Sequence, residues 1–237
     1  KKKKRGIGEA TAKKLAGAGA KVVITARRTE RLNELKETIE KEGGTALVVT
    51  ADVTSKDDWK NIIEKTHETF GKVDVLVNNA GLMPLSFVEN LKTDEWDTMV
   101  DVNIKGVLNG VSSVVPDMKE NKSGHIINIS SVAGRKIMPA GSVYCATKYA
   151  VRALSEGIRL EMGPKYNTKV TSIEPGFVAT ELTQTITDDD VQDMLSQFAD
   201  LKTLEAEDIA NSIHYALTQP EHSSVNEILI RPTNQDL

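Results

Sequence analysis

Residues 21–54 of the chain read KVVITARRTERLNELKETIEKEGGTALVVTADVT. Two short runs rich in β-branched residues, 21–25 and 46–50, enclose a longer stretch, 29–41, in which apolar side chains recur at helical spacing. A strand, a helix and a second strand in this order form the unit that builds parallel sheets covered by helices. The segment therefore predicts an α/β fold with a doubly wound parallel sheet.

The same alternation extends along the rest of the chain. We expect further strands at 73–78, 125–130, 169–173 and 227–230, and further helices at 9–18, 56–70, 93–118, 142–162 and 205–217. Ser55 is the expected N-cap of the helix at 56–70. Four glycines mark expected helix ends: Gly17, Gly43, Gly71 and Gly163.

The length and composition predict one domain that covers residues 1–237. The chain is 39% hydrophobic and 27% charged, and it contains no internal repeat and no linker-like stretch. Residues 183–200 interrupt the alternation with Asp188, Asp189 and Asp190 ahead of a weakly amphipathic stretch. We interpret this interruption as a mobile helical lid over a substrate cleft.

Charge and cysteine content exclude several classes of protein. The formal net charge is -4 and the basic residues are scattered, so nucleic acid is not an expected partner. The run from Lys1 to Arg5 would suit a localisation signal, but a helical pattern follows at once. The single Cys145 forms no intrachain disulfide and no apolar run is long enough to span a membrane, which favours a cytoplasmic protein. We interpret Cys145 as a buried apolar side chain rather than a nucleophile.

Features of a dinucleotide site lie in the first half of the chain. Gly6, Ile7 and Gly8 precede the first expected helix, where backbone N–H groups and the helix dipole bind pyrophosphate in nucleotide-binding folds. The alternative for these glycines is a flexible terminus. No metal site is expected.

The residues after the strand at 21–25 bear on the choice of cofactor. Arg27 and Arg28 stand where NAD-selective sites carry an acidic residue for the ribose hydroxyls. A guanidinium matches a phosphate in charge and geometry, so Arg27, assisted by Arg5 or Arg28, favours the 2′-phosphate of NADP(H). The alternative is a solvated pair of charges at the entry to a helix.

Polar residues follow two other strands at the edge where open α/β sheets bind ligands. Asp52 and Val53 follow the strand at 46–50, and Asn78, Asn79, Ala80 and Gly81 end the strand at 73–78. We expect them to contact the adenine and ribose, except that Asn78 or Asn79 is expected to have only a structural role in the turn.

Tyr144 and Lys148 form the expected chemical centre. They are four residues apart in an expected helix, so both side chains lie on one face. Hydride loss from an alcohol carbon needs a base for the hydroxyl proton, and a nearby ammonium would favour the phenolate of tyrosine. Ser131, which follows the strand at 125–130, would hold the substrate oxygen. Asn103 would hold a water that passes the proton to bulk solvent through Lys148.

Together these motifs resemble the short-chain dehydrogenase/reductase family over almost the whole chain. The resemblance rests on Gly6-Ile7-Gly8, Asn78-Asn79-Ala80-Gly81, Asn103, Ser131, Tyr144-x-x-x-Lys148 and Pro175-Gly176-Phe177-Val178-Ala179-Thr180. It implies a Rossmann-type domain with Ser131, Tyr144, Lys148 and Asn103 as the catalytic group. It also implies cofactor contacts from Asp52, Val53, Asn79 and the segment with Pro175, Gly176, Val178 and Thr180.

The resemblance further implies an oligomer and a substrate class. Family members form a homotetramer or homodimer through the helices that hold Asn103 and Tyr144. The ending from Asn226 to Thr233 resembles the branch that oxidises serine-like and 3-hydroxy acids, so a small polar substrate is expected. Arg135 or Lys136 would pair with a substrate carboxylate, unless these are solvated loop charges.

The start of the chain departs from the family pattern. Family members begin with a hydrophobic strand and a T-G-x-x-x-G-I-G turn, whereas Lys1 and Lys2 stand where the Thr and first Gly belong. Without that strand we expect exposed sheet edges, weaker folding and weaker cofactor binding. We favour a truncated or altered start over a degenerate family member.

The sequence therefore predicts an NADP-dependent oxidoreductase acting on a small alcohol or carbonyl substrate. The alternative is a non-catalytic nucleotide-binding or regulatory protein on the same fold, which binds a partner without turnover.

Overall fold

The predicted alternation of strands and helices is present in the computed structural model, which describes residues 6–196 and 202–235. All four strand pairs in the two sheets of the described residues are parallel, as expected for a sheet assembled from βα units. The strands are β1 (Lys21–Ala26), β2 (Thr45–Thr50), β3 (Val75–Asn78), β4 (Gly124–Ile129), β5 (Thr168–Pro175) and β6 (Glu227–Ile230).

Helices connect these strands at nearly all the predicted positions. The α-helices are α1 (Ile7–Gly17), α2 (Thr29–Lys41), α3 (Lys56–Phe70), α4 (Thr93–Val100), α5 (Gly106–Asn121), α6 (Ser142–Tyr166), α7 (Asp189–Ser196) and α8 (Ala206–Leu217). Short helical turns occur at η1 (Val88–Asn90), η2 (Asp101–Lys105), η3 (Val132–Gly134) and η4 (Glu181–Thr185).

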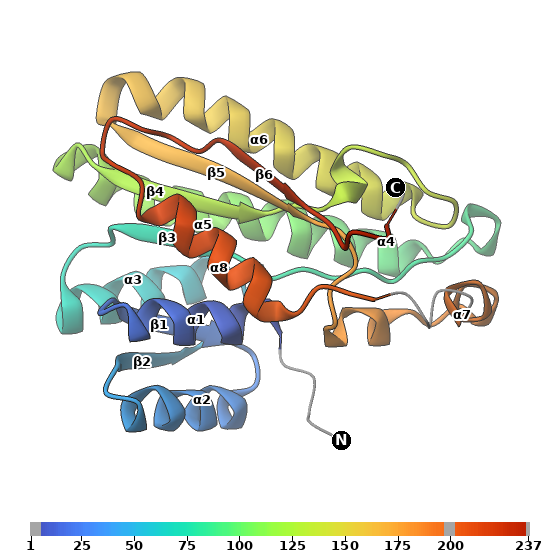
Figure 1. Ribbon diagram of the computed structural model, residues 1–237, viewed down its shortest axis with the longest axis horizontal. Helices are drawn as coiled ribbons and strands as arrows, with labels where there is room; N and C mark the ends of the chain where they lie inside the picture. The colour runs from blue at the N-terminus through green and yellow to red at the C-terminus, as the bar shows by residue number, and fades with distance from the viewer. Residues whose placement is uncertain (1–5, 197–201, 236–237) are drawn as a thin grey trace.

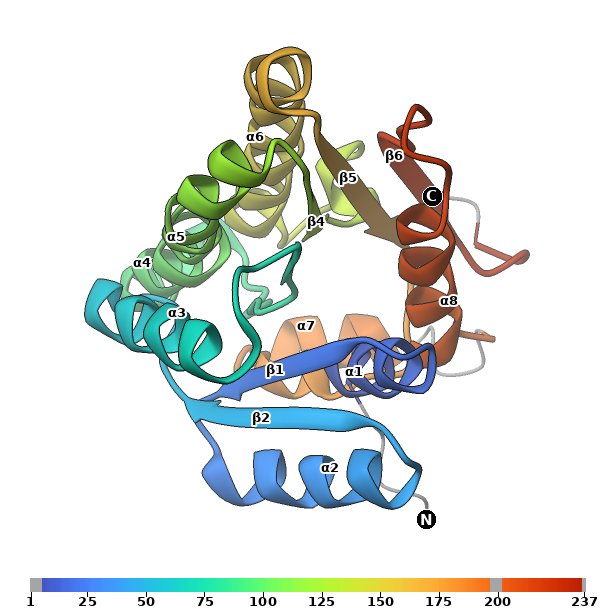
Figure 2. The ribbon, with the colours of Figure 1, turned by 90° about the vertical axis from the view of Figure 1, so that its left-hand side faces the viewer.

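The sheet is divided into two parts. β1 pairs only with β2, whereas β3, β4, β5 and β6 form a second sheet in that order, and no ladder joins β1 to β3 in the described residues. Figure 2 shows β1 and β2 below, and β4, β5 and β6 above. Val75 at the start of β3 is 37% exposed although it is an apolar strand residue. The two free sheet edges that the sequence predicted are therefore present.

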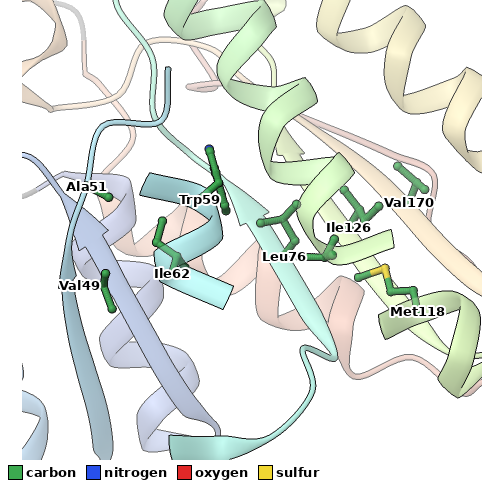
Figure 3. Close-up of a cluster of buried hydrophobic side chains, with 9 residues drawn as sticks. Val49, Ala51, Trp59, Ile62, Leu76, Met118, Ile126 and Val170 are labelled. Atoms are coloured by element: carbon green, nitrogen blue, oxygen red, sulfur yellow. The ribbon is translucent and has the colours of Figure 1, made fainter. Parts of the chain in front are cut away.

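Helices nevertheless bury both faces of these strands (Figure 1). On one face α5 packs against both α3 and α6, and on the other α1 packs against both α2 and α8. One core cluster spans the division between the two sheets, because β2 contributes Val49 and β3 contributes Leu76 to it. Figure 3 shows these side chains beside Trp59 and Ile62 of α3. Burial of this shared cluster holds the two sheets together without a connecting strand.

Two predicted helix boundaries were wrong, and one cap was right. Gly163 does not end its helix, because α6 continues through Pro164 to Tyr166, and Asn167 then takes the left-handed conformation at φ 51°. The stretch 93–118 is not one regular helix, since the π-helical turn η2 separates α4 from α5. Ser55 does cap α3, and its hydroxyl accepts a hydrogen bond from Asp58 N at 3.1 Å.

Within residues 6–196 and 202–235, no helix is both long enough and apolar enough to cross a lipid bilayer.

Candidate active site

Ser131 lies directly after β4, in a turn that is pressed against α6. Its hydroxyl accepts a hydrogen bond from Ala133 N at 3.1 Å and donates to the Pro175 carbonyl at 3.4 Å. The hydroxyl of the preceding Ser130 donates to the carbonyl of Lys148 at 2.9 Å. A Cβ atom on Gly134 would lie 2.9 Å from that same carbonyl, so only glycine allows the turn to approach α6 this closely. The turn therefore fixes Ser131 relative to Lys148.

Tyr144 projects from the first turn of α6 and is only 5% exposed. Burial raises the pKa of its phenol to about 12, because a phenolate is poorly solvated there, and the nearby Ser131 hydroxyl only partly offsets this rise. The sequence led us to expect that Lys148 would lower this pKa. In this arrangement desolvation is the larger effect, and Tyr144 is a neutral phenol at physiological pH.

Lys148 is one helical turn beyond Tyr144, as the spacing predicted. Its Nζ donates a hydrogen bond to the carbonyl of Ile129 at 2.9 Å and lies 5.7 Å from the centre of the Tyr144 ring. The side chain is 6% exposed, and this burial lowers its pKa to about 8. Lys148 is therefore still a cation at pH 7, held between the end of β4 and the face of Tyr144.

Asn103 lies in the π-helical turn η2, and its side chain is held on two sides. Its Oδ1 accepts from Leu82 N at 2.8 Å, and its Nδ2 donates to the Leu82 carbonyl at 3.0 Å and to the Thr147 hydroxyl at 3.1 Å. Single π-helical turns are frequent at functional sites, where they redirect a side chain. The contact to Thr147 joins η2 to α6, and no local pattern in the sequence predicts it.

Glycine and asparagine meet at the start of α1. A Cβ atom on Gly8 would lie 2.8 Å from the Asn79 amide nitrogen, so Asn79 packs directly on the first turn of this helix. The Asn78 amide instead donates to Asn128 at 2.9 Å, deep between β3 and β4. The expected structural role thus belongs to Asn78, although it binds another side chain and not the backbone of the turn. Arg5 lies outside the described residues.

Two basic residues follow β1, where the sequence predicted the adenosine end of a cofactor. Arg27 is 4.0 Å from the Asp52 carboxylate, and Arg28 is 3.6 Å from that of Glu181. Both guanidiniums are largely exposed and therefore accessible to an anion. Hydrogen bonds from the backbone and hydroxyl of Thr54 are the main causes that keep the pKa of Asp52 low. Val53 packs against Gly106 of α5 and accepts from the Trp59 indole at 3.0 Å.

The segment from Pro175 to Thr180 leaves the end of β5 and is held by two distant residues. Leu204 brackets it, since Leu204 N donates to the Phe177 carbonyl and Ala179 N donates to the Leu204 carbonyl. The Gln235 side chain lies against Gly176 and accepts a hydrogen bond from Phe177 N at 3.0 Å. Neither Leu204 nor Gln235 has a local sequence pattern that predicts this role.

These elements bring the predicted residues to one edge of the molecule. The four residues of the expected catalytic group lie together, with Ser131 after β4, Tyr144 and Lys148 in α6, and Asn103 in η2. Asn79 and Gly8 lie beside each other, and Glu181, which follows the segment Pro175–Thr180, reaches the residues after β1. The carboxyl ends of strands from both sheets therefore lie at this edge, which is where open α/β sheets bind ligands.

Comparison with known proteins identifies the group to which this fold belongs. The sequence model of the family described as short chain dehydrogenase matches residues 3–191. The chain belongs to the short-chain dehydrogenase family. An uncharacterized oxidoreductase of Staphylococcus saprophyticus is 46% identical over 233 residues, which are 98% of this chain and 94% of that protein. A second uncharacterized oxidoreductase, from Listeria innocua, is 46% identical over 231 residues, 97% of this chain and 93% of that one.

Solved structures agree with this assignment. The closed form of a serine dehydrogenase complexed with NADP+ superposes with a TM-score of 0.90 at 32% identity, covering 98% of this chain and 93% of that one. A gluconate 5-dehydrogenase from Burkholderia cenocepacia, in complex with NADP and tartrate, gives a TM-score of 0.83 at 28% identity, covering 96% and 90%. This short-chain dehydrogenase is an oxidoreductase with the Rossmann-type fold predicted from its sequence.

The expected lid of this dehydrogenase is anchored to the segment before α4. Within the interval 183–200 the structure describes residues up to 196, with η4 leading into α7. Asp188 is 5% exposed and accepts hydrogen bonds from Ser86 at 2.5 Å and Asn90 at 2.8 Å. These hydrogen bonds, led by that from Ser86, lower its pKa. The acidic residue that precedes α7 is thus a structural anchor.

In this short-chain dehydrogenase, Arg135 of the loop beside Ser131 has structural partners. Arg135 was one of two residues expected to pair with a substrate carboxylate. Its guanidinium is instead paired with the fully buried carboxylate of Glu174 and with Glu227. Lys136 in the same loop is exposed. Cys145 is 1% exposed and its thiol donates weakly to the Lys136 carbonyl at 3.7 Å, which agrees with its interpretation as a buried apolar residue.

Proposed function

We propose that this short-chain dehydrogenase uses NADP(H) to move hydride between the nicotinamide and a small alcohol or carbonyl substrate. One observation carries the proposal: Ser131, Tyr144 and Lys148 converge on one side of α6. Hydrogen bonds hold the Ser131 hydroxyl and the Lys148 ammonium in place, and the Ser131 hydroxyl lies beside the Tyr144 phenol. Such convergence of a hydroxyl, a phenol and a buried ammonium suits proton transfer at a carbon that gains or loses hydride.

The protonation states favour reduction of a carbonyl as the direction that this site is prepared for. Tyr144 is a neutral phenol, so it can donate its proton to the oxygen of a carbonyl group as that oxygen gains negative charge. Ser131 would donate a hydrogen bond to the same oxygen. Lys148, a cation at pH 7, would stabilise the phenolate left on Tyr144. For alcohol oxidation the same three residues act in the reverse order.

Asn103 would complete the catalytic group by holding the other residues of the site in position. Its amide holds Leu82 after β3 and Thr147 beside Lys148, so it fixes the distance between the two halves of the site. The water that Asn103 was predicted to hold would lie next to Lys148 and carry the proton onward. Gly81 leaves room there, because a Cβ on it would lie 3.4 Å from Asn103 Oδ1 and 3.6 Å from Lys148 Nζ.

The residues at the adenosine end fit NADP(H), which supplies or accepts the hydride when bound. Gly6 provides no side chain to cap α1, so N–H groups of the first turn remain for a pyrophosphate. Arg27 and Arg28 provide exposed guanidiniums for the 2′-phosphate. The adenine and ribose would be contacted by the residues that follow β2 and β3, namely Asp52, Val53, Asn79, Ala80 and Gly81. The nicotinamide would be bordered by residues that end or follow β5, namely Pro175, Gly176, Val178 and Thr180. The serine dehydrogenase and gluconate 5-dehydrogenase relatives are both complexed with NADP.

The substrate we propose is a small polar alcohol or ketone of the 3-hydroxy acid type. Similarity to the serine dehydrogenase supports it, as does the C-terminal sequence pattern. Arg135 and Lys136 were the two cations expected to pair with a substrate carboxylate. Because Arg135 is paired with Glu174, the exposed Lys136 is the one that remains for this role. Residues 183–200 would cover this substrate as a lid.

We further propose that the protein forms a homodimer or homotetramer through the helices next to the site. Leu108 of α5 and Tyr149 and Leu160 of α6 are large apolar residues that are 42%, 39% and 58% exposed. An interface across α5 and α6 would cover them. Sedimentation analysis of the wild-type chain and of a Leu108→Glu, Leu160→Glu variant tests this, since only the variant should sediment as a monomer.

A second candidate function is a non-catalytic nucleotide-binding or regulatory protein on the same fold. The two functions differ in one measurement. The dehydrogenase oxidises NADPH in the presence of a 3-oxo acid or another small carbonyl compound, and the regulatory protein binds the cofactor without consuming it.

A further inference from the structure

An ion pair between Glu181 and two arginines crosses the proposed cofactor cleft. Glu181 Oε2 accepts a hydrogen bond from Arg31 Nη1 at 2.7 Å and lies 3.6 Å from Arg28 Nη2. The arginines belong to the start of α2, immediately after β1, whereas Glu181 begins η4 after the segment that follows β5. The contact therefore joins the proposed adenosine end of the site to the entrance of the lid.

Arg31 has no role in the cofactor site predicted from the sequence. It lies three positions after Arg28, so the two side chains leave the same face of the first turn of α2. They converge on one carboxylate oxygen of Glu181, which carries a single negative charge. The pKa of Glu181 is held low, mainly by the hydrogen bond from Arg31, so this carboxylate is charged at neutral pH. Two guanidiniums thus share one anionic oxygen.

Two other carboxylates act on Arg31, but less strongly than Glu181 does. Glu34 lies one turn along α2, and Glu9 of α1 also acts on Arg31 at longer range. Glu9 is itself within 3.3 Å of Lys13. The direct hydrogen-bond partner of Arg31 on the cleft side is Glu181.

We propose that Arg31 is a third arginine of the 2′-phosphate site and that Glu181 occupies this site in place of the phosphate until NADP(H) binds. This inference rests on the proposed function, because it assigns the cofactor that function requires. A phosphate monoester carries up to two charges and three acceptor oxygens, so it is a better partner for two guanidiniums than one carboxylate. All three side chains are partly exposed, at 63%, 42% and 29% for Arg28, Arg31 and Glu181, so the phosphate can reach them.

The partial exposure of these side chains also limits how much each of them changes the affinity for a 2′-phosphate. A partly exposed ion pair contributes little free energy, so displacing Glu181 costs at most about fivefold in affinity. Removing that competitor should tighten binding of a 2′-phosphate by the same factor, about two- to fivefold. Loss of the Arg31 guanidinium should weaken it by about tenfold. Ligands without the phosphate should respond to neither change.

The test uses adenosine 2′,5′-bisphosphate and adenosine 5′-monophosphate as probes, measured by titration calorimetry with the full chain. We expect Arg31→Gln to lower the preference for the bisphosphate and Glu181→Gln to raise it. Lys41→Gln and Glu37→Gln serve as matched controls, because they remove the same charges from exposed positions further along α2. They should leave the preference unchanged.

Two results would overturn the proposal. Arg31→Gln could keep the wild-type preference, which would place Arg31 outside the phosphate site. Glu181→Gln could weaken binding of both probes, which would mean that Glu181 binds the ribose itself. The probes contain no nicotinamide, so these outcomes are independent of whether the chain consumes NADPH. A chain that shows the predicted preferences but no turnover would contradict the proposed enzyme and leave the phosphate site in place.

Discussion

Lys148 donates a hydrogen bond from its ammonium group to the carbonyl oxygen of Ile129, at 2.9 Å, within a buried site. This bond fixes the ammonium at the end of β4, but it does not replace the full solvation that water would give the charge. The pKa of Lys148 is accordingly lowered from 10.5 to about 8 by burial. The relationship links the proposed chemistry to the stability of the fold.

The free energy of unfolding should therefore rise with pH because of Lys148. Between about pH 8 and pH 10.5 the folded chain has released the Lys148 proton while the unfolded chain still holds it, so stability increases across that window. The gain should be about 3 kcal/mol at most. Urea unfolding of the wild type and of Lys148→Met at pH 7.5 and pH 10 measures it as the difference between the two proteins. Equal pH dependence in both would contradict the buried cation.

Tyr144 should act in the opposite sense at higher pH. Its pKa is raised from 10.0 to about 12, so above pH 10 the unfolded chain loses the phenolic proton first and stability falls. Ultraviolet titration at the phenolate band should show one tyrosine that ionises near pH 12, and this transition should be missing from Tyr144→Phe. Replacement of the exposed Tyr149 of the same helix by Phe is the matched control, and it should leave the transition near pH 12 in place. Ionisation of Tyr144 near pH 10 would contradict its burial.

Gly8→Ala should weaken cofactor binding and stability together. The added Cβ would lie 2.8 Å from the Asn79 amide nitrogen, so Asn79 must leave its position beside the first turn of α1. Because the clash is with the end of a side chain that can move, we expect a loss of about 1 kcal/mol in unfolding free energy. Gly17→Ala is the control, because its Cβ meets nothing within 4 Å at the end of the same helix. Chemical denaturation measures both, and a Gly8→Ala protein as stable as the control would show that Asn79 does not pack there.

Glu174→Gln should destabilise the fold far more than Glu227→Gln. The Glu174 carboxylate is fully buried and is bound by Arg135 and by the Ser172 hydroxyl at 3.0 Å. Removing its charge takes away the buried one of the two carboxylates that Arg135 pairs with, at a cost of about 2–4 kcal/mol. Glu227 also pairs with Arg135, but its side chain is 39% exposed, so its loss should cost about 1 kcal/mol or less. Equal unfolding free energies for the two variants would contradict this difference.

Local patterns in the sequence predicted much of the architecture and the centre of the site. Hydrophobic spacing located six strands, and the four-residue spacing of Tyr144 and Lys148 correctly put both on one face of α6. Both features depend on helix and strand geometry, which neighbouring residues determine. Gly163 shows the limit of such rules, since α6 continues past it to an asparagine cap.

The contacts that sequence analysis missed join residues far apart in the chain. Thr147 binds Asn103 across 44 positions, Gln235 binds Phe177 N across 58, and Glu181 binds Arg31 across 150. No periodicity connects such residues, because tertiary packing alone brings them together. The pKa of Tyr144 was mispredicted for the same reason, since the sequence named its charged neighbour but not the extent of its burial.

The most direct test of the proposed activity is a fluorescence titration of the purified chain with NADPH and with NADH, followed by oxidation of the bound cofactor with a panel of aldehydes, ketones and 3-oxo acids. We predict tighter binding of NADPH, its consumption with a small polar carbonyl substrate, and a loss of turnover of at least about 100-fold in Tyr144→Phe with cofactor affinity unchanged. NADPH that binds but is not consumed by any member of the panel, or turnover that persists in Tyr144→Phe, would contradict the proposed dehydrogenase.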